Sequence, residues 1–482
     1  MTETSAGEPP ADPTKGPVEP IDQRTLMRLF ISATLASSLL PLNSTMIAVA
    51  LPEIGLEFGA APADLTQALV VVYLLAGIVA QSPAGKIGDM WGHARTLVLG
   101  RWMFAGAAVL GVVSPFLFGL SVSRILMAVG GALMIPATMA LLRIYISVER
   151  RSRLFGFFGS AMASAAALGP LIGGVLTEHF GWASVFLANI PILALSIVLQ
   201  PRGLPDTRAV NATDSGGKGV KSGLRQFDWL GSVLLGVGLV ALVTVVRTPG
   251  SAALILGTVG AVSLAGFVFW ELRVPLPVVD LTLFRRATFS AGAIMIALQN
   301  VAMYATLFQM PFYLAVLIDA GPSEIGIALL AMSGGMVLFA PVGGMLSERI
   351  GVRLTVLGGA AISVLGIGSL IATFGMPSLA IVTACLLVFG CGFGLSHGPI
   401  QAAALSSIPP QHSGMASGVI ATLRYVGGVV GIAALGLLLA SDPASADLTI
   451  HRRAFTLYVG SLVLTLVLAL AMPRFLRDVE VK

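Results

Sequence analysis

Long apolar stretches, separated by short polar segments, follow one another along almost the whole chain. Uncharged runs of about 18 residues or more, enough to cross roughly 30 Å of hydrocarbon as a helix, recur between Leu29 and Arg474. Their ends predict fourteen spanning helices that begin near residues 27, 64, 95, 119, 153, 181, 228, 250, 287, 322, 353, 378, 413 and 453. The pattern therefore predicts an all-α integral membrane protein, with both termini on the same side because the number of spans is even.

Composition agrees with this prediction. Hydrophobic residues make up 56% of the 482 residues and charged residues 11%, well below the roughly 25% of charged residues in soluble domains. A water-soluble globular protein is thereby excluded.

The basic residues predict the orientation. Of the 28 Lys and Arg residues, Arg247, Arg452 and Arg453 fall on one side and Arg124 and Arg424 lie within predicted spans. The remaining 23 fall on the side of the termini, and cytoplasmic loops are the ones that collect Lys and Arg. Both termini are therefore expected in the cytoplasm, and the alanine- and glycine-rich composition favours a bacterial inner membrane. The positive charge is spread over short loops, so we expect contact with membrane lipids and not with nucleic acid.

Polar segments divide the chain into six parts. Residues 1–24 are rich in proline and predict a disordered tail, and residues 201–227 are rich in Gly, Ser and Lys and predict a flexible linker. Between and after them we expect a six-helix bundle at 25–200, a helix pair at 228–271, a second six-helix bundle at 272–476 and a short tail at 477–482. Both tails and the linker are expected to be cytoplasmic.

A short internal repeat supports two equivalent bundles. The segment "GKIGDMWG" recurs 259 residues later as "GMLSERIG". The matching positions are Gly85, Ile87, Gly88, Asp89 and Gly92 in the first copy and Gly344, Leu346, Ser347, Glu348 and Gly351 in the second. Each copy is expected in the loop between the second and third spans of its half, which predicts two parallel six-helix repeats with an inserted pair.

This repeated motif and three others resemble the major facilitator superfamily, in particular its fourteen-helix drug:proton antiporters. The resemblance covers the chain after the tail. Its first motif contains Gly85, Gly88, Asp89, Gly92 and Arg95. The resemblance implies that this loop gates the cytoplasmic side, with the small residues Gly414, Ala416 and Gly418 as a docking place for Asp89. The alternative is that Asp89 is a solvated loop acid.

The second motif is "SRILMAVGGALMIP", which contains Arg124, Gly130, Ala132 and Pro136 and departs from the family pattern at Met127 and Ala128. The resemblance ties Arg124 to proton transfer. An arginine inside a span normally faces the bundle interior or water, and the alternative is a side chain that snorkels to the interface.

The third motif is "LGPLIGG", with Gly169, Pro170, Gly173 and Gly174, and it is similar to the fifth-helix signature of exporters. Small residues let helices pack closely and proline bends a span, so a hinge between the two halves is expected here. Tight packing without a role in transport is the alternative.

The fourth motif is "LNSTMIAVALP" in the first span, where Asn43 replaces the Asp that antiporters commonly carry. An amide can hydrogen-bond a substrate or a neighbouring helix, but it cannot take up a proton or balance a cation. No Asp or Glu lies deep in any predicted span, which disfavours dicationic substrates. Neutral, zwitterionic or anionic substrates are favoured, with Arg124 and Arg424 as possible counter-charges.

Other polar residues in the spans predict the rest of a substrate cavity. Gln299 and Asn300 lie near the middle of one span, and Tyr304 follows Asn300 by one turn on the same face. His397, in the twelfth predicted span, is a candidate proton carrier, with a neutral, hydrogen-bonded histidine as the alternative. Arg424 is either functional or an arginine that bonds neighbouring helices.

The sequence therefore predicts a secondary active exporter of amphipathic small molecules, coupled to protons and working by alternating access. The residues expected to contact substrate are Asn43, Gln299, Asn300, Tyr304 and Arg424. Those expected to couple protons or gate are Asp89, Arg95, Arg124 and His397. The alternatives are an uncoupled facilitator, a metabolite importer or a membrane sensor. No enzymatic activity, metal or cofactor is expected, because five histidines and no intramembrane carboxylate form no catalytic cluster.

Overall fold

The described part of the chain is built from helices. The computed structural model describes residues 22–146, 148–201, 228–245, 248, 251–274, 277, 281–373, 378–408, 413–440 and 448–475. The expected tail, residues 1–24, lies outside them except for its last three residues, as do most of the linker at 201–227 and all of the tail at 477–482.

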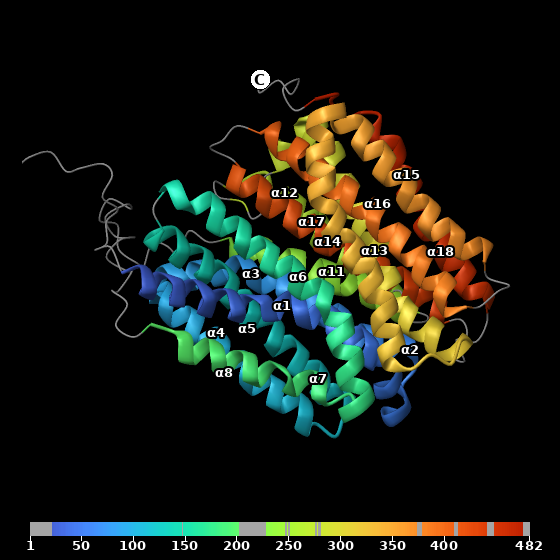
Figure 1. Ribbon diagram of the computed structural model, residues 1–482, viewed down its shortest axis with the longest axis horizontal. Helices are drawn as coiled ribbons and strands as arrows, with labels where there is room; N and C mark the ends of the chain where they lie inside the picture. The colour runs from blue at the N-terminus through green and yellow to red at the C-terminus, as the bar shows by residue number, and fades with distance from the viewer. Residues whose placement is uncertain are drawn as a thin grey trace, which may run out of the picture.

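The N-terminal helices form one bundle (Figure 1). In chain order they are α1 (Gln23–Phe58), α2 (Pro62–Leu65), the π-helical turn η1 (Thr66–Val71), α3 (Val72–Trp91), α4 (His93–Val113), α5 (Leu117–Tyr145), α6 (Val148–Phe180), α7 (Ser184–Leu187) and α8 (Asn189–Leu199).

The C-terminal helices form a second bundle that packs against the first (Figure 1). They are the 3-10 turn η2 (Leu281–Arg285), α13 (Ala287–Leu317), α14 (Pro322–Ile350), α15 (Val352–Ala372), α16 (Leu379–Ser406), α17 (Ser413–Ala440) and α18 (Leu448–Ala469).

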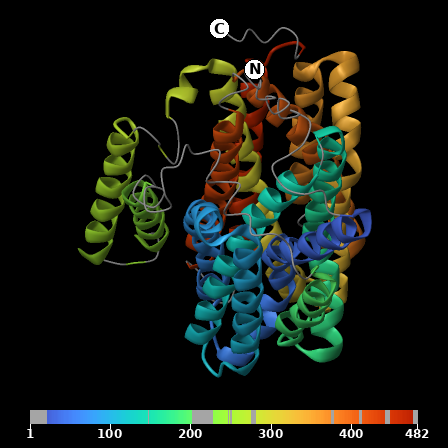
Figure 2. The same ribbon diagram turned by 90° about the vertical axis from the view of Figure 1, so that its left-hand side faces the viewer.

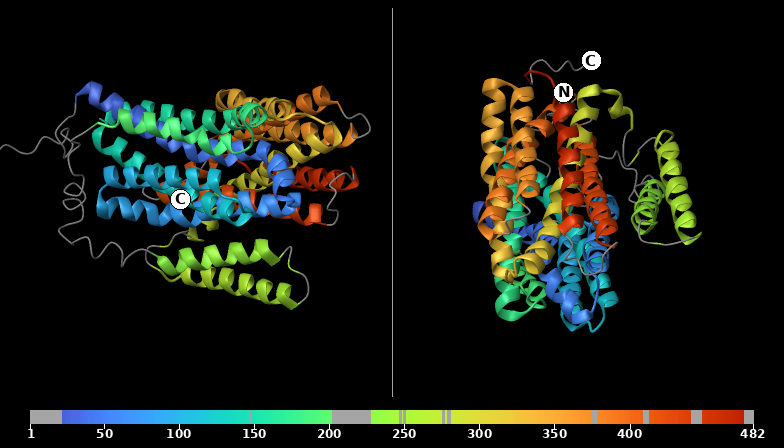
Figure 3. Two further views of the ribbon diagram at one scale, coloured as in Figure 1. Left: turned by 90° about the horizontal axis from the view of Figure 1, so that it is seen from below. Right: turned by 90° about the vertical axis from the view of Figure 1, so that its right-hand side faces the viewer.

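Between the bundles in sequence come α11 (Trp229–Val245) and α12 (Ser251–Glu271), which pack on each other. This pair stands at the side of the two bundles, as Figures 2 and 3 show. Its contacts with the rest run mainly from α11 to α3, where Gly236 lies against Val79.

Twelve helices of the described residues are long and apolar enough to cross a membrane, two fewer than the sequence predicts. The other two predicted spans correspond to shorter apolar helices, Ser184–Leu199 and Trp229–Ala241. Large apolar side chains such as Leu254, Val262 and Leu365 remain more than 60% exposed, which suits a surface solvated by lipid tails.

The two copies of the repeat adopt the same backbone conformation. Gly92 separates α3 from α4 at φ 91°, and Gly351 separates α14 from α15 at φ 97°. Only glycine adopts such an angle without strain, which explains why both copies end on this residue. The expectation that each copy forms a loop is wrong, since all residues before the final glycine continue the helix and only one residue makes the turn.

The two bundles approach each other closely where α6 crosses α14. A Cβ atom on Gly174 would lie 2.4 Å from the carbonyl oxygen of Pro322, and one on Gly326 would lie 2.6 Å from that of Pro170. Beside this crossing, the Ser323 backbone N–H of α14 donates to Glu178 Oε2 of α6 at 3.0 Å. The absence of side chains at the two glycines therefore sets the distance between the bundles here.

Candidate substrate cavity

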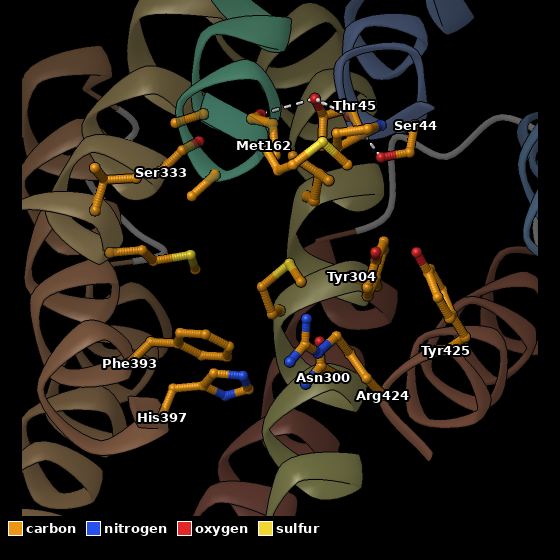
Figure 4. A pocket seen from close by; sticks show the side chains of 18 of the residues that line it. Ser44, Thr45, Met162, Asn300, Tyr304, Ser333, Phe393, His397, Arg424 and Tyr425 are labelled. Atoms are coloured by element: carbon orange, nitrogen blue, oxygen red, sulfur yellow. Dashed lines mark hydrogen bonds between the residues drawn. The ribbon is translucent and has the colours of Figure 1, made fainter. Parts of the chain in front are cut away.

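A cavity of about 550 Å³ lies between the two bundles. The N-terminal bundle contributes residues of α1, α3, α5 and α6 to its wall, and the C-terminal bundle contributes residues of α13, α14, α16 and α17. Figure 4 shows Ser44, Thr45 and Met162 on one side and Asn300, His397 and Arg424 on the opposite side. Any molecule held here contacts both bundles.

Most of the wall is apolar. Flexible thioether side chains are prominent in it, and they are Met162, Met303, Met332 and Met336. Methionine adapts its shape to different partners, as in other binding surfaces that accept many ligands. The wall thus fits apolar molecules of varied shape.

The nitrogen-containing polar groups of the wall lie mainly on the C-terminal bundle. Asn300 and Tyr304 lie one turn apart on α13, as predicted, and the guanidinium of Arg424 lies beside Asn300 in Figure 4. Arg424 Nη2 donates to Gln401 Oε1 at 3.1 Å, and Asn300 Nδ2 donates to the carbonyl oxygen of Ile296 at 2.8 Å. The structure therefore brings together Asn300, Tyr304, His397 and Arg424.

His397 is held from behind by Gln299. Gln299 Oε1 lies 3.0 Å from His397 Nδ1, and because an amide oxygen only accepts, Nδ1 carries a proton. Gln299 Nε2 donates in turn to Ser396 Oγ at 2.8 Å. The imidazole stacks on Phe393, with ring centroids 4.8 Å apart and an angle of 14° between the planes. Gln299 is fully buried and is not among the residues that line the cavity. It therefore positions His397 and is not itself part of the cavity wall.

Asn43 also lies behind the cavity wall. Its Nδ2 donates to Asn189 Oδ1 of α8, and Asn189 Nδ2 donates to the carbonyl oxygen of Phe186 at 2.8 Å. Only 1% of Asn43 is exposed, and the wall is formed instead by its neighbours Ser44 and Thr45. Of the two roles open to Asn43, the structure shows the bond between helices.

Arg124 is fully buried inside the N-terminal bundle, so the snorkelling alternative is wrong. Its Nε donates to the carbonyl oxygen of Leu69 at 2.8 Å, and its Nη1 donates to that of Asn43 at 3.3 Å. Leu69 lies in the π-helical turn η1, a distortion that is frequent at functional sites. The guanidinium also lies 3.8 Å from the ring centroid of Tyr73, which lines the cavity. Arg124 thus contacts the wall from behind.

The glycines of the fifth-helix motif serve close packing. A Cβ atom on Gly169 would lie 2.1 Å from Thr45 Oγ1 and one on Gly173 would lie 2.4 Å from the carbonyl oxygen of Met46, both in α1. With Gly174 facing α14, this stretch of α6 touches both a helix of its own bundle and the opposite bundle. Pro170 is buried within α6.

The candidate gating residues lie away from the cavity. Gly85 and Gly88 belong to α3, Gly92 forms the turn, and Arg95 is exposed near the start of α4. The side chain of Asp89 and the surroundings of Gly414 lie outside the described part of the structure, whereas Ala416 is fully buried in α17 and Gly418 is exposed.

Three contributors to the site were missed from the sequence. Tyr73 and Tyr425 line the cavity, and Phe393 forms the stack with His397. The spacing of four residues between Phe393 and His397 places them on one helix face and was a usable signal. Nothing in the sequence around Tyr73 distinguishes it from a residue at the lipid interface.

The sequence analysis counted Arg101 among the 23 basic residues on the side of the termini, but the structure buries it in α4 with 1% of its surface exposed. It donates to Gln200 Oε1 at 2.6 Å and to Ser32 Oγ at 2.8 Å. These neutral partners come from α1 and from the end of α8, so Arg101 ties three helices together.

Comparison with known sequences identifies a family of transporters, which agrees with an architecture of two bundles around a central cavity. The sequence profile of the Major Facilitator Superfamily matches residues 33–432. The chain belongs to this superfamily.

Individual relatives of this protein align with most of its chain. It is 32% identical over 420 residues to an uncharacterized MFS-type transporter, YvkA, of Bacillus subtilis, covering 85% of this chain and 90% of the relative. It is also 32% identical over 409 residues to the tetracenomycin C resistance and export protein of Streptomyces glaucescens, covering 83% and 73%. The protein is therefore a multi-pass membrane transporter of a family with bacterial members.

Solved structures of other transporters share the fold of this protein. The crystal structure of a D-xylose-proton symporter superposes with a TM-score of 0.67 at 15% identity, covering 95% of this chain and 99% of that one. At this identity the likeness concerns the fold alone.

Proposed function

We propose that this transporter is a secondary active exporter of amphipathic small molecules and belongs to the fourteen-helix drug:proton antiporters. The fourteen spans are the twelve long helices together with Ser184–Leu199 and Trp229–Ala241. Both termini lie in the cytoplasm, and the membrane is a bacterial inner membrane. The similarity to a resistance and export protein supports the direction of transport.

The cavity between the bundles carries this proposal. Its adaptable apolar wall and its few polar groups match ligands that have an apolar body and a polar end. Because residues of both bundles line it, rocking of one bundle against the other exposes the same site to each side of the membrane in turn. We take residues 25–200 and 272–476 as the two moving units and 228–271 as an inserted pair.

Proton coupling is assigned to His397, because imidazole is the side chain in the cavity wall whose ordinary pKa in water is closest to neutral pH. The protonation of His397 would then change how the cavity opens to each side of the membrane. We assign this coupling to Arg124, which contacts Tyr73, and to the motif residues Asp89 and Arg95. In the proposed orientation the crossing of α6 and α14 closes the outer side in this structure. The hinge is the Pro170 region of α6.

A liposome experiment tests both transport and coupling. The purified full chain is reconstituted, a pH gradient is imposed, and internal pH is recorded while cationic, neutral and anionic amphipathic compounds are added. An exporter coupled to protons discharges the gradient when a substrate is added, and His397→Gln abolishes this discharge. Compounds that fail to cross at all contradict the proposed function.

An uncoupled facilitator is the second candidate, and the chemistry of the wall favours it. Among the described residues that line the cavity, none is an acid, and Asn43 stands where relatives of the proposed branch carry one. In this case substrates cross the liposome membrane down their own gradient while the pH gradient stays untouched.

A further inference from the structure

We propose that the preferred substrates of the cavity are aromatic amphipaths with one negative charge, a carboxylate or an acidic phenol, and that Arg424 binds the charge. This inference rests on the proposed function, because it names the substrate class of the same cavity.

The charge of the wall is the first argument. Arg424 is the permanently charged side chain among the described residues that line the cavity, and no acid accompanies it there. Its hydrogen-bond partner is the neutral amide of Gln401, and its Nε has no hydrogen-bond partner in the described part of the chain. A cation in an apolar, partly dehydrated site is costly without a counter-charge, and an anionic ligand supplies one.

Geometry adds a second argument. A guanidinium presents its N–H groups in a planar fork that matches a carboxylate. In Figure 4 the guanidinium of Arg424 is directed toward the middle of the cavity, between Asn300 and His397. His397 lines the same part of the wall.

The flat side chains around Arg424 indicate the body of the substrate. Tyr304 and Tyr425 lie on one side of it and the stacked rings of Phe393 and His397 lie on the other. Aromatic rings pack favourably against such faces in offset or edge-on arrangements. Beyond them, the methionines and Ile135 accept the rest of an apolar molecule.

A positively charged substrate is disfavoured by the same groups. In a site of low dielectric constant the repulsion between two like charges is several times stronger than in water. A ligand with two negative charges would leave one of them without a basic partner while His397 is neutral. One negative charge is therefore the best match.

Three fluorescent probes that share a pyrene ring on a short alkyl chain and differ in the charge of the head group test the inference. They are 1-pyrenebutyrate, its primary amide and 1-pyrenebutylamine, with charges of −1, 0 and +1 at neutral pH. Binding to the full chain in nanodiscs is measured by fluorescence anisotropy, and binding to empty nanodiscs is subtracted. We expect the acid to bind about tenfold more tightly than the amine, with the amide between them.

Variants locate the charge preference. Arg424→Gln should remove the advantage of the acid over the amide while the affinity for the amide changes by less than about threefold, which also shows that the variant is folded. Arg424→Lys should retain part of the preference, because it keeps the charge and loses the fork. Arg273→Gln is the matched control, since Arg273 lies beyond α12 and stacks on Phe269.

Each outcome is decisive. The inference is overturned if the amine binds as tightly as the acid, or if the preference survives in Arg424→Gln. If the amide or the amine binds with no preference for the acid, the cavity still takes amphipaths and only the charge assignment is wrong. If none of the three probes binds, the cavity as a site for amphipaths fails together with the inference.

Discussion

Buried amide side chains connect helices of this protein. Asn43 joins α1 to α8 through Asn189, and Gln299 joins α13 to α16 through Ser396 and His397. An amide both donates and accepts, so such a pair satisfies itself without bringing a net charge into a low-dielectric interior. These residues therefore set the positions of the groups that line the cavity.

Replacement of Asn43 by alanine should lower the free energy of unfolding by about 1–3 kcal/mol, because the buried amide of Asn189 loses a partner. The measurement is denaturant unfolding in detergent. Ser44→Ala is the control, since among the described residues Ser44 Oγ donates to the carbonyl oxygen of Pro41, one turn away in the same helix. If the double variant Asn43→Ala/Asn189→Ala is destabilised by the sum of the single effects, the two side chains do not interact.

Replacement of Gln299 by leucine should slow efflux of an amphipathic substrate about tenfold, because His397 loses the acceptor that fixes its ring. Substrate affinity should change by less than about threefold, since Gln299 is not part of the wall. Transport rates and binding are measured on the same liposome preparation.

The matched control is Gln309→Leu, because Gln309 contacts another buried histidine, His451, at 2.9 Å but does not line the cavity. Equal losses of transport in both variants would show that the effect is general destabilisation and not the orientation of His397.

At the scale of helices, the crossing of α6 and α14 is the contact that the proposed alternating access would have to break. The backbones touch at Gly174 and Gly326, and the carboxylate of Glu178 accepts from the N-terminus of α14. An anion at a helix N-terminus is favourable, but the bond is exposed and its contribution is modest. Such a contact is tight enough to define one state and weak enough to open.

Gly326→Val should shift the protein away from the state seen here, because its side chain would meet the carbonyl oxygen of Pro170 at 2.6 Å. Spin labels on the ends of α6 and α14 report the shift as a longer distance. Gly334→Val on the same helix is the control, because a Cβ atom there meets nothing within 4 Å. An unchanged distance distribution in Gly326→Val would mean that the crossing tolerates a larger separation.

At the scale of the whole molecule, the proposed mechanism requires the two bundles to separate at this crossing and close elsewhere. A tether between Glu178→Cys and Ser323→Cys should therefore reduce transport by about tenfold or more, and reductive release of a cleavable thiol linker should restore it. The native thiols Cys385 and Cys391 are first replaced by serine. Each single-cysteine variant treated with the linker is the control, and full transport by the tethered protein would contradict rocking at this crossing.

In the internal repeat, the glycine spacing was visible in the sequence but the helical conformation of the residues before the final glycine was not. Two segments 259 residues apart shared their glycine spacing, and the structure gives Gly92 and Gly351 the same positive φ. The sequence suggested loops around them, because polar residues near a predicted membrane boundary look like a loop. Helices α3 and α14 instead continue up to Trp91 and Ile350, the residues just before these glycines, since a helix satisfies its own backbone hydrogen bonds whether or not lipid surrounds it.

The sequence by itself determined that this chain is a bundle of membrane helices with a duplicated half, because apolar length and glycine spacing are properties of a linear segment. It also predicted Asn300, Tyr304, His397 and Arg424 as site residues, and these four line the cavity between the bundles. Only the tertiary structure decided that Asn43, Gln299 and Arg124 stand one layer behind the wall. A membrane helix is apolar on every side, so its pattern does not show which face meets a cavity, a neighbouring helix or lipid. The packing of the two bundles makes that choice, and with it decides which polar groups a substrate meets.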